Sequence, residues 1–533
     1  MPRRHHATVL LALTALLGPQ MPAAAQSRPQ AAVVHPVAPV QMLVRARSVS
    51  PAPLQPAVVE PAEPVDPWVE RVETRLATIE HVAQQRSDAE PSAPSEESAL
   101  ERELATIASA GPRSASVGIA VHELGTGNPV FTWHEREALN PASNQKLLTA
   151  AAALELLGAD YRFQTRVLRS GDALVIVGEG DPSLQTGHLR AMAEQIAERT
   201  DLSKIRRIVV DDSAFSERRF GPGYDSEGPG PSYMAPSGAL SLQWNTIEIG
   251  IRGAAKGQPV EVWVSPPSAH VTVQSSATGG RGTISTQTRA DGERTVIDVR
   301  GNLPAGSSTK TRRRITDPGR FTGTTFANLL RHHGAAALRI ERGIAPDDAE
   351  TLVTHESEAL PEVLRTSLSY SNNFASEQLL RTLGWRMTGE PGDWTNGRLA
   401  VRRYWDAAGL PLRDLLFENA SGLSSWGRLT AGSLARLLAF ATREGSEASV
   451  LPDVLPAAGK EGTMRGRLGR AKGRVNAKTG TMNGASALSG VVQTRGGERL
   501  GFSILVAGPI SAHRSRRLQD RVVMALVEHD GAA

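Results

Sequence analysis

The chain has 533 residues, of which 40% are hydrophobic, a formal net charge of +4 and no cysteine. This length is sufficient for large hydrophobic cores and for more than one domain, so we expect a globular protein with appendages. The absence of cysteine excludes disulfides, a thiol nucleophile, cysteine-ligated zinc and lipid attachment through a cysteine.

The first residues have the pattern of an export signal. Arg3 and Arg4 precede an apolar run at 7–17, and small residues follow up to Ala25. The apolar run is too short to span a membrane comfortably. We therefore expect residues 1–25 to be a cleaved signal peptide and the protein to be exported, periplasmic or associated with the cell wall. An uncleaved anchor is the alternative.

Residues 26–97 are rich in Pro, Ala, Val, Glu and Ser, a composition typical of an extended linker. Within this linker, apolar residues spaced by three and four predict a short amphipathic helix at 68–84. This helix is either a docking or self-association segment or a marginally formed helix on a flexible tether. Its short length favours the tether.

The folded part of the chain is expected to begin at residue 98. Alternating apolar residues at 115–124 and 130–133 predict a hairpin, and an Ala- and Leu-rich run from Lys146 to Gly158 predicts a buried helix. Ser143 and Lys146 fall on one face of the first turn of this helix. A serine nucleophile with a lysine base requires this arrangement.

The Ser-x-x-Lys spacing is a weak signal by itself. The same pattern occurs from Ser307 to Lys310, in a polar stretch that no apolar helix follows, so it arises readily by chance. The alternative for Ser143 is an ordinary helix N-cap beside a solvated lysine. The rest of the chain must decide between these two interpretations.

Short strand-like segments separated by turn residues occupy the middle of the chain. They lie at 163–168, 173–177, 205–210, 246–251, 260–264, 271–274, 282–288 and 295–299, with a helical segment near 188–198. We therefore expect a large, mainly β inserted region at 163–349.

Helical patterning returns after this region and is followed by strands. Helices are predicted at 324–333, 359–368, 374–384, 399–408, 431–442 and 514–528, and strands at 475–481, 485–493 and 500–507. The helix at 374–384 is expected to stop at Gly384. This order predicts an α+β fold (an α/β sandwich) in which residues 98–162 and 350–533 form an antiparallel sheet with helices packed on it.

Three sequence elements line up in chain order: Ser143-x-x-Lys146, Ser371-Asn372-Asn373 and Lys478-Thr479-Gly480. Together they are the signature of serine β-lactamases and penicillin-binding proteins. On these motifs the chain resembles the low-molecular-mass class C penicillin-binding proteins, the D-alanyl-D-alanine carboxypeptidase/endopeptidase family. The long separation between the first two motifs matches the inserted region of this family, which compact β-lactamases lack. Further matching segments lie at 180–184, 210–215, 239–241, 419–424 and 462–465.

The resemblance implies a serine β-lactamase/penicillin-binding transpeptidase-like domain that acts on D-Ala-containing peptidoglycan stem peptides. Ser143 would attack the carbonyl between the last two D-alanines and carry the acyl-enzyme, with Lys146 as its base. Asn373 would hold Lys146 and the substrate amide by hydrogen bonds. Ser371 would relay a proton to the departing D-alanine nitrogen.

The third motif is implied to recognise the end of the substrate. Lys478, with the hydroxyls of Thr479 and Thr481, would bind the terminal carboxylate by charge-assisted hydrogen bonds. Gly480 would let the substrate backbone lie close to the strand. Backbone N–H groups of Ser143 and Thr481 would form the oxyanion hole.

Two positions depart from the pattern of the family. The family often has Asp where this chain has Asn372, which we count among the substrate-binding residues, and Asp-Gly-Ser-Gly where this chain has Asn419-Ala420-Ser421-Gly422. Neither change removes a reactive group, so they bear on substrate preference. Two rival functions stay open: a β-lactamase or esterase of the same superfamily, and a catalytically silent cell-wall-binding protein.

The expected partners are peptidoglycan stem peptides and β-lactam antibiotics, which would occupy Ser143 without ready release. The sequence has no His-Glu-x-x-His and no phosphate-binding Gly-rich lysine loop, so we expect no metal and no cofactor. Because export is expected, we expect no nucleic acid partner and at most peripheral membrane or cell-wall association. The basic clusters at 310–314 and 514–521 are interpreted as solvated faces, with binding of anionic wall polymer as the alternative. The oligomeric state is left open.

Overall fold

The computed structural model describes residues 66–87, 98–224 and 230–531. All of them belong to one compact unit of the chain, Pro64–Ala533. The predicted signal peptide and most of the predicted linker lie outside the described residues. Among the helices that are described, none is long and apolar enough to cross a membrane.

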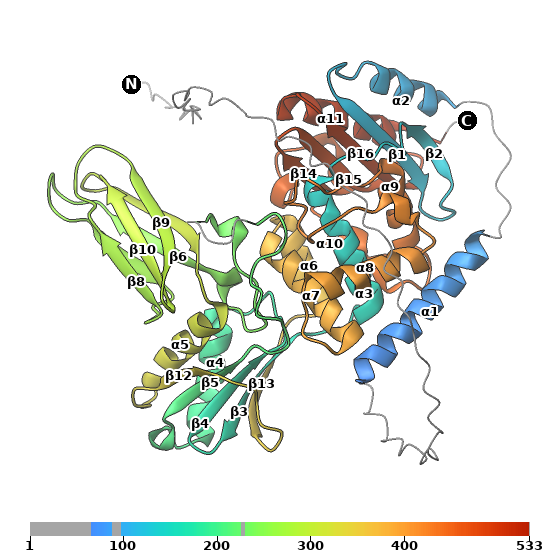
Figure 1. The fold of residues 1–533 in the computed structure, drawn as a ribbon. Helices are drawn as coiled ribbons and strands as arrows, with labels where there is room; N and C mark the ends of the chain where they lie inside the picture. Colours follow the sequence, from blue (N-terminus) through green and yellow to red (C-terminus); the bar gives the residue numbers. More distant parts are fainter. Residues whose placement is uncertain (1–65, 88–97, 225–229, 532–533) are drawn as a thin grey trace, which may run out of the picture. The chain divides into compact units, whose positions relative to one another are not determined.

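A five-stranded antiparallel sheet forms the centre of the outer domain, the name used here for residues 98–162 and 357–531 (Figure 1). The order of its strands is β14-β15-β16-β1-β2. Their bounds are β1 (Ser116–Glu123), β2 (Pro129–Trp133), β14 (Val475–Met482), β15 (Ala485–Gln493) and β16 (Arg499–Ala507). β1 and β2 are the predicted hairpin, and β14, which carries Lys478, is an edge strand of the sheet.

Helices cover both faces of this sheet because side chains alternate along a strand. Ile119 and Val121 of β1 join a core with α2 (Ala99–Ser109) and α11 (Ala512–Glu528), whereas Ala120 between them joins a core with α3 (Lys146–Leu157) and α9 (Ala431–Ala441). The predicted α+β fold is therefore confirmed, as a three-layer arrangement of helix, sheet and helix.

The helix after the proposed nucleophile is buried along its whole length. Every residue of α3 is buried, which explains its composition of Ala and Leu on all sides. The other helices of this layer are α6 (Leu360–Ser369), α7 (Asn373–Thr388), α8 (Trp394–Ala407) and the short α10 (Leu451–Val454). One detail of the prediction is wrong: α3 begins at Lys146, and Ser143 lies in a preceding 3-10 turn, Ala142–Gln145.

The predicted helix stop at Gly384 is also wrong. α7 continues through Gly384 to Thr388 and ends before Gly389, whose φ of +73° is left-handed. A Cβ atom on Gly384 would lie 2.1 Å from Asn396 Oδ1 and 2.6 Å from the backbone nitrogen of Gly397. This glycine is therefore explained by the close approach of α8, which local sequence does not reveal.

The helix in the predicted linker is longer and more firmly attached than expected. α1 spans Pro67–Ser87, and its Val72, Leu76 and Ile79 are buried in the same core as α3, α7 and α8. Arg75 Nη1 donates a hydrogen bond of 2.7 Å to the Glu155 carbonyl. The tether interpretation was therefore wrong for these residues, because burial against the outer domain stabilises a helix that would be marginal alone.

The inserted region contains two groups of strands. In the first, a sheet of order β12-β5-β4-β3-β13 packs one face against α4 (Thr186–Arg199) and α5 (Pro318–Arg331). Its strands are β3 (Gln164–Ser170), β4 (Ala173–Gly178), β5 (Arg207–Asp211), β12 (Arg339–Arg342) and β13 (Glu350–Glu356). The second group has the sheets β11-β6-β7 and β8-β10-β9. Its strands are β6 (Thr246–Arg252), β7 (Glu261–Ser265), β8 (Val271–Ser275), β9 (Ile284–Asp291), β10 (Arg294–Gly301) and β11 (Ser308–Arg314).

Two sequence expectations change in this region. β13 pairs with β3, so the chain returns to the outer domain after Glu356 and not at residue 350.

The second Ser-x-x-Lys pattern lies at the start of β11, where Lys310 is exposed and forms an ion pair of 2.8 Å with Glu248. Arg314 of the adjoining basic cluster is buried and hence is not part of a solvated face.

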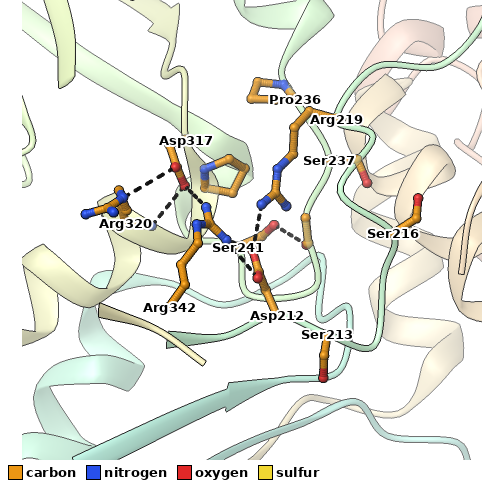
Figure 2. Close-up of polar contacts among 12 residues, drawn as sticks. Asp212, Ser213, Ser216, Arg219, Pro236, Ser237, Ser241, Asp317, Arg320 and Arg342 are labelled. Atoms are coloured by element: carbon orange, nitrogen blue, oxygen red, sulfur yellow. Dashed lines mark hydrogen bonds and ion pairs between the residues drawn. The ribbon is translucent and has the colours of Figure 1, made fainter. Parts of the chain in front are cut away.

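A network of opposite charges joins several elements of the inserted region (Figure 2). Arg342 at the end of β12 donates from Nη1 to both carboxylate oxygens of Asp212 at 2.8 Å, and from Nη2 to Asp317 at 2.6 Å. Arg219 adds a hydrogen bond of 2.9 Å to Asp212, and the Arg320 backbone N–H donates to Asp317. The network therefore connects the end of β5, the start of α5 and the loop that carries Arg219.

Buried side chains of α7 fix this inserted region next to the outer domain. Arg381 donates from Nη1 to Ser237 Oγ at 3.0 Å and from Nη2 to the Ser216 carbonyl at 2.7 Å. Gln378 Nε2 donates to the Gly238 carbonyl at 2.9 Å. The helix that begins at Asn373 thus also holds the loops of the inserted region.

Candidate active site

Lys146 lies at the centre of the candidate site and is 1% exposed. Its Nζ atom is 3.0 Å from Ser143 Oγ, 2.8 Å from Asn373 Oδ1 and 2.7 Å from the Ser421 carbonyl oxygen. Asn373 Nδ2 donates to the Tyr233 carbonyl at 3.1 Å, which orients the amide oxygen toward Lys146. The first two sequence motifs therefore meet at one amine.

The backbone around Ser143 is held between two glycine-containing segments. A Cβ atom on Gly480 would lie 2.8 Å from the Pro141 carbonyl oxygen, and one on Gly422 would lie 1.9 Å from the Ala142 carbonyl oxygen. Ala142 itself has a left-handed φ of +46°. Because only glycine permits both approaches, β14 and the 419–422 loop can lie directly against the turn that carries Ser143.

The second motif places its three residues in different environments. Ser371 has a left-handed φ of +54°, and its Oγ accepts a hydrogen bond of 2.8 Å from Lys478 Nζ. Asn372 is the N-cap of α7, where its side-chain oxygen accepts from the Ala375 N–H at 3.2 Å. A strained backbone at Ser371 costs about 1–3 kcal/mol and is a feature that clusters at functional sites.

The third motif lies along the edge strand β14. Lys478 is 0% exposed, and its Nζ also donates to the Thr479 carbonyl at 2.7 Å. Gly480 is buried, Thr479 is half-buried and Thr481 is exposed. The strand therefore offers a buried amine beside an accessible threonine.

Burial changes the protonation of both lysines. Burial lowers the pKa of Lys146 to about 7, although the Glu377 carboxylate opposes this shift. Burial also lowers the pKa of Lys478 well below its ordinary value, and the nearby charge of Lys146 lowers it further. A substantial fraction of Lys146 is therefore neutral near pH 7, as a general base requires.

Glu377 and Ser421, which were not among the predicted site residues, support this site. Both carboxylate oxygens of buried Glu377 accept hydrogen bonds, from Tyr224 Oη (3.2 Å), Trp394 Nε1 (2.8 Å), Ala420 N (3.1 Å) and Ser421 N (2.9 Å). Glu377 thus fixes the loop whose Ser421 carbonyl contacts Lys146. A sequence signal existed for each residue: Glu377 follows Asn373 by one helical turn, and Ser421 lies within a segment that matches the family.

Comparisons with known proteins agree with the fold and motifs. Residues 100–529 match the model of the D-Ala-D-Ala carboxypeptidase 3 (S13) family. A D-alanyl-D-alanine carboxypeptidase from an Actinomadura species is 33% identical over 445 residues, which cover 78% of this chain and 81% of the relative.

Two solved structures show the same fold. The crystal structure of penicillin binding protein 4 from Haemophilus influenzae matches with a TM-score of 0.68 at 20% identity and covers 80% of this chain and 99% of that one. The same protein complexed with a β-lactam matches with a TM-score of 0.65 at 19% identity, over 79% and 99% of the two chains. The resemblance to low-molecular-mass class C penicillin-binding proteins is confirmed, and this chain belongs to the D-Ala-D-Ala carboxypeptidase 3 family.

Proposed function

We propose that this protein is an exported serine D,D-carboxypeptidase and D,D-endopeptidase that cleaves peptidoglycan stem peptides after a D-alanine carbonyl. The observation that carries the proposal is the position of Lys146, whose Nζ lies 3.0 Å from Ser143 Oγ and whose pKa is about 7. The name of the Actinomadura relative supports the carboxypeptidase half of the proposal. The endopeptidase half rests on chemistry, since both reactions break an amide after the same carbonyl.

The hydrogen bonds of Lys146 favour its action as a base. Asn373 Oδ1 and the Ser421 carbonyl oxygen can only accept hydrogen bonds, so they use the two N–H groups of a neutral amine. The remaining lone pair of Nζ then faces Ser143 Oγ. Lys146 would take the hydroxyl proton as Ser143 Oγ bonds to the substrate carbonyl carbon, which gives a tetrahedral oxyanion and an ammonium group.

The backbone N–H groups of Ser143 and Thr481 would stabilise this oxyanion. One such donor typically contributes about 3 kcal/mol to transition-state stabilisation. Lys478 would bind the carboxylate at the end of the substrate, together with the hydroxyls of Thr479 and Thr481. An incoming carboxylate would also favour the protonated form of Lys478, whose pKa is lowered by burial in the free protein.

Collapse of the intermediate requires a proton on the leaving nitrogen. Ser371 would donate its hydroxyl proton to that nitrogen and be reprotonated through Lys478 Nζ, which lies 2.8 Å away. The amide C–N bond breaks, the leaving amine departs and the acyl group remains on Ser143 Oγ. The proton that Lys146 took from Ser143 would replace the one that Lys478 gave up, so that Lys146 is neutral again. Water would then attack the ester carbonyl and give one proton to Lys146, which passes that proton to Ser143 Oγ as the C–O bond of the ester breaks.

A β-lactam would acylate Ser143 by the same steps, but its leaving nitrogen stays tethered to the acyl group, which hinders release. The β-lactam complex of the structurally similar Haemophilus influenzae protein supports this expectation. The experiment is mass spectrometry of the intact protein after benzylpenicillin treatment. We expect one slowly released adduct on Ser143, no adduct on Ser143→Ala, and full labelling of Ser307→Ala, which changes the second Ser-x-x-Lys pattern.

The rival functions predict different results in this experiment. Rapid multiple turnover of benzylpenicillin would indicate a β-lactamase, and an undiminished adduct on Ser143→Ala would reject the proposed nucleophile. Absence of any adduct, together with no release of free D-alanine from monomeric muropeptides, would indicate a silent wall-binding protein. Loss of cross-linked dimers during digestion would separate endopeptidase from carboxypeptidase activity.

A further inference from the structure

A cavity of about 560 Å³ lies beside the second motif, between the inserted region and the outer domain. Ser183, Gln185 and Trp244 line it from the inserted region, and Glu358, Ser367 and Asn372 line it from the outer domain. Its volume and its position between two substructures are typical of small-molecule sites. Asn372, which lines the cavity, is the chain neighbour of both Ser371 and Asn373 of the candidate active site, although neither of those two residues lines the cavity.

Trp244 is presented to this cavity by a strained backbone. Gln243, Trp244 and Asn245 have consecutive left-handed φ angles of +55°, +58° and +51°. Such strain persists only where surrounding contacts impose it. Here the Gln243 N–H donates to the Leu184 carbonyl at 3.0 Å, and Asn245 Nδ2 donates to the Pro236 carbonyl at 2.8 Å.

The ring of Trp244 is not used to complete a hydrophobic core. It is only half-buried, and it belongs to none of the hydrophobic clusters of the described residues. The Arg312 guanidinium lies 5.6 Å from the ring centroid and helps to fix the ring. The fold therefore maintains a costly turn that displays a fixed aromatic surface in a cavity.

Two polar groups of the cavity lack a partner that a ligand could supply. Ser367 is 3% exposed, and its Oγ has no hydrogen-bond partner among the described residues. A buried hydroxyl without a partner is destabilising, and a ligand that pairs with it removes that cost. The exposed Glu358 carboxylate also has no partner in the described part of the chain, whereas Glu362 is paired with Arg365 at 3.2 Å. The cavity thus combines an aromatic ring, a buried hydroxyl, side-chain amides and one unpaired carboxylate.

We propose that this cavity binds an N-acetylated amino sugar of the peptidoglycan glycan strand. A sugar ring offers an apolar face for Trp244, hydroxyl groups that can donate to Glu358, and further hydroxyl groups for Ser367. A single unpaired carboxylate suits a neutral polyhydroxylated ring better than a strongly cationic ligand. The sugar would position the attached stem peptide and select polymeric substrate over free peptide.

The length of a stem peptide is compatible with this arrangement. Four extended residues reach at most about 14 Å, so a sugar at the start of the stem must bind close to the reacting serine. The cavity meets this requirement at Asn372, which adjoins Asn373, and Asn373 Oδ1 lies 2.8 Å from Lys146 Nζ. The identity of the substrate in this inference rests on the proposed function, whereas the binding site rests on the geometry of the cavity alone.

The test compares two substrates that differ only in the sugar. D-Alanine release is measured from a disaccharide pentapeptide and from the same pentapeptide without the disaccharide, for the wild type, Glu358→Gln, Trp244→Leu and the control Glu356→Gln. Glu356 is exposed on β13 and is not part of the cavity lining. We expect the wild type and the control to prefer the disaccharide substrate, and each cavity variant to reduce that preference by about tenfold without slowing cleavage of the free peptide.

A direct binding measurement separates this inference from the proposed function. Saturation-transfer NMR uses the soluble N-acetylglucosaminyl–N-acetylmuramic acid disaccharide with its lactyl carboxyl amidated, so that the probe is neutral like the stem-linked sugar. It is expected to show binding to Ser143→Ala protein and loss of binding in the double variant with Glu358→Gln. Equal cleavage of both substrates by the wild type, or a preference that the cavity variants retain, overturns the inference. Binding of the disaccharide without cleavage of either peptide supports the sugar site while rejecting the peptidase activity.

Discussion

This protein has two largely buried clusters of ionisable side chains, and they differ in whether the charges are paired with opposite charges. In the inserted region, Arg342 and Arg219 face the carboxylates of Asp212 and Asp317. Burial opposes the charge of Asp317, yet the Arg320 backbone N–H and Arg342 lower its pKa overall. Likewise, burial works against the charge of Arg342, but hydrogen bonds to Asp212 and Asp317 raise its pKa.

The candidate active site contains two buried lysines for which the described residues provide no carboxylate at hydrogen-bond distance. Lys146 and Lys478 contact hydroxyl, amide and carbonyl oxygens, and burial lowers the pKa of each. Paired charges are fixed and can hold structural elements together, whereas unpaired buried amines change protonation near neutral pH. In the inserted region, ion pairs offset the cost of burying a charge and join structural elements. In the candidate active site, that cost instead lowers the pKa of the lysines, which is proposed to enable catalysis.

Replacement of Lys146 tests the unpaired cluster most severely. Lys146→Met keeps a side chain of similar length but removes the base, and we expect acylation by benzylpenicillin to fall about 10³-fold. Circular dichroism and thermal unfolding control for folding, since the variant also removes a costly buried amine. A folded variant that acylates at more than about a tenth of the wild-type rate would show that Lys146 is not the base.

Replacement of Asp212 tests the paired cluster. Asp212→Asn leaves Arg219 and Arg342 with one carboxylate fewer, and we expect the free energy of unfolding to fall by about 2 kcal/mol, between the values for exposed and buried ion pairs. Urea denaturation measures this loss, and activity per folded molecule should be unchanged. Unaltered stability, or a selective loss of activity in folded protein, would contradict the assigned structural role.

The pH dependence of acylation tests the lowered pKa of Lys146. The neutral amine is the active form, so the rate should rise with pH through about 7 and then level off. Between about pH 6 and about pH 8 the expected increase is about tenfold, and Asp212→Asn should show the same profile. A flat profile, or a rate that falls as the pH rises through this window, would argue against a neutral lysine base.

The smallest effect is expected at the second Ser-x-x-Lys pattern. Lys310 is exposed and pairs with Glu248 at the surface of β11. Lys310→Ala should therefore change the free energy of unfolding by at most about 0.5 kcal/mol and leave penicillin acylation unchanged. If Lys310→Ala reduced acylation as much as Lys146→Met does, the exposed Lys310 would be as important for acylation as the buried Lys146, which contradicts the proposed roles.

Local sequence was sufficient to predict most elements of the fold. The hairpin at β1 and β2, the buried helix α3 and the edge strand β14 follow from short-range periodicity and turn residues. Three differences from the prediction arise where tertiary contacts override local preference. α1 is stabilised by docking, α7 passes through Gly384 because α8 lies close, and β13 pairs with a distant strand.

The sequence by itself determined which reactive groups are present, because Ser143, Lys146, Ser371, Asn373 and Lys478 lie in short motifs with recognisable spacing. Tertiary structure decided the environment of those groups. Asn373 and Ser421 are separated from Lys146 by 227 and 275 positions, yet they supply two of its three hydrogen-bond partners. The local pattern predicted that the helix beginning at Lys146 is buried, but the pKa of Lys146 depends on which distant segments enclose its amine, and only the packed chain determines that.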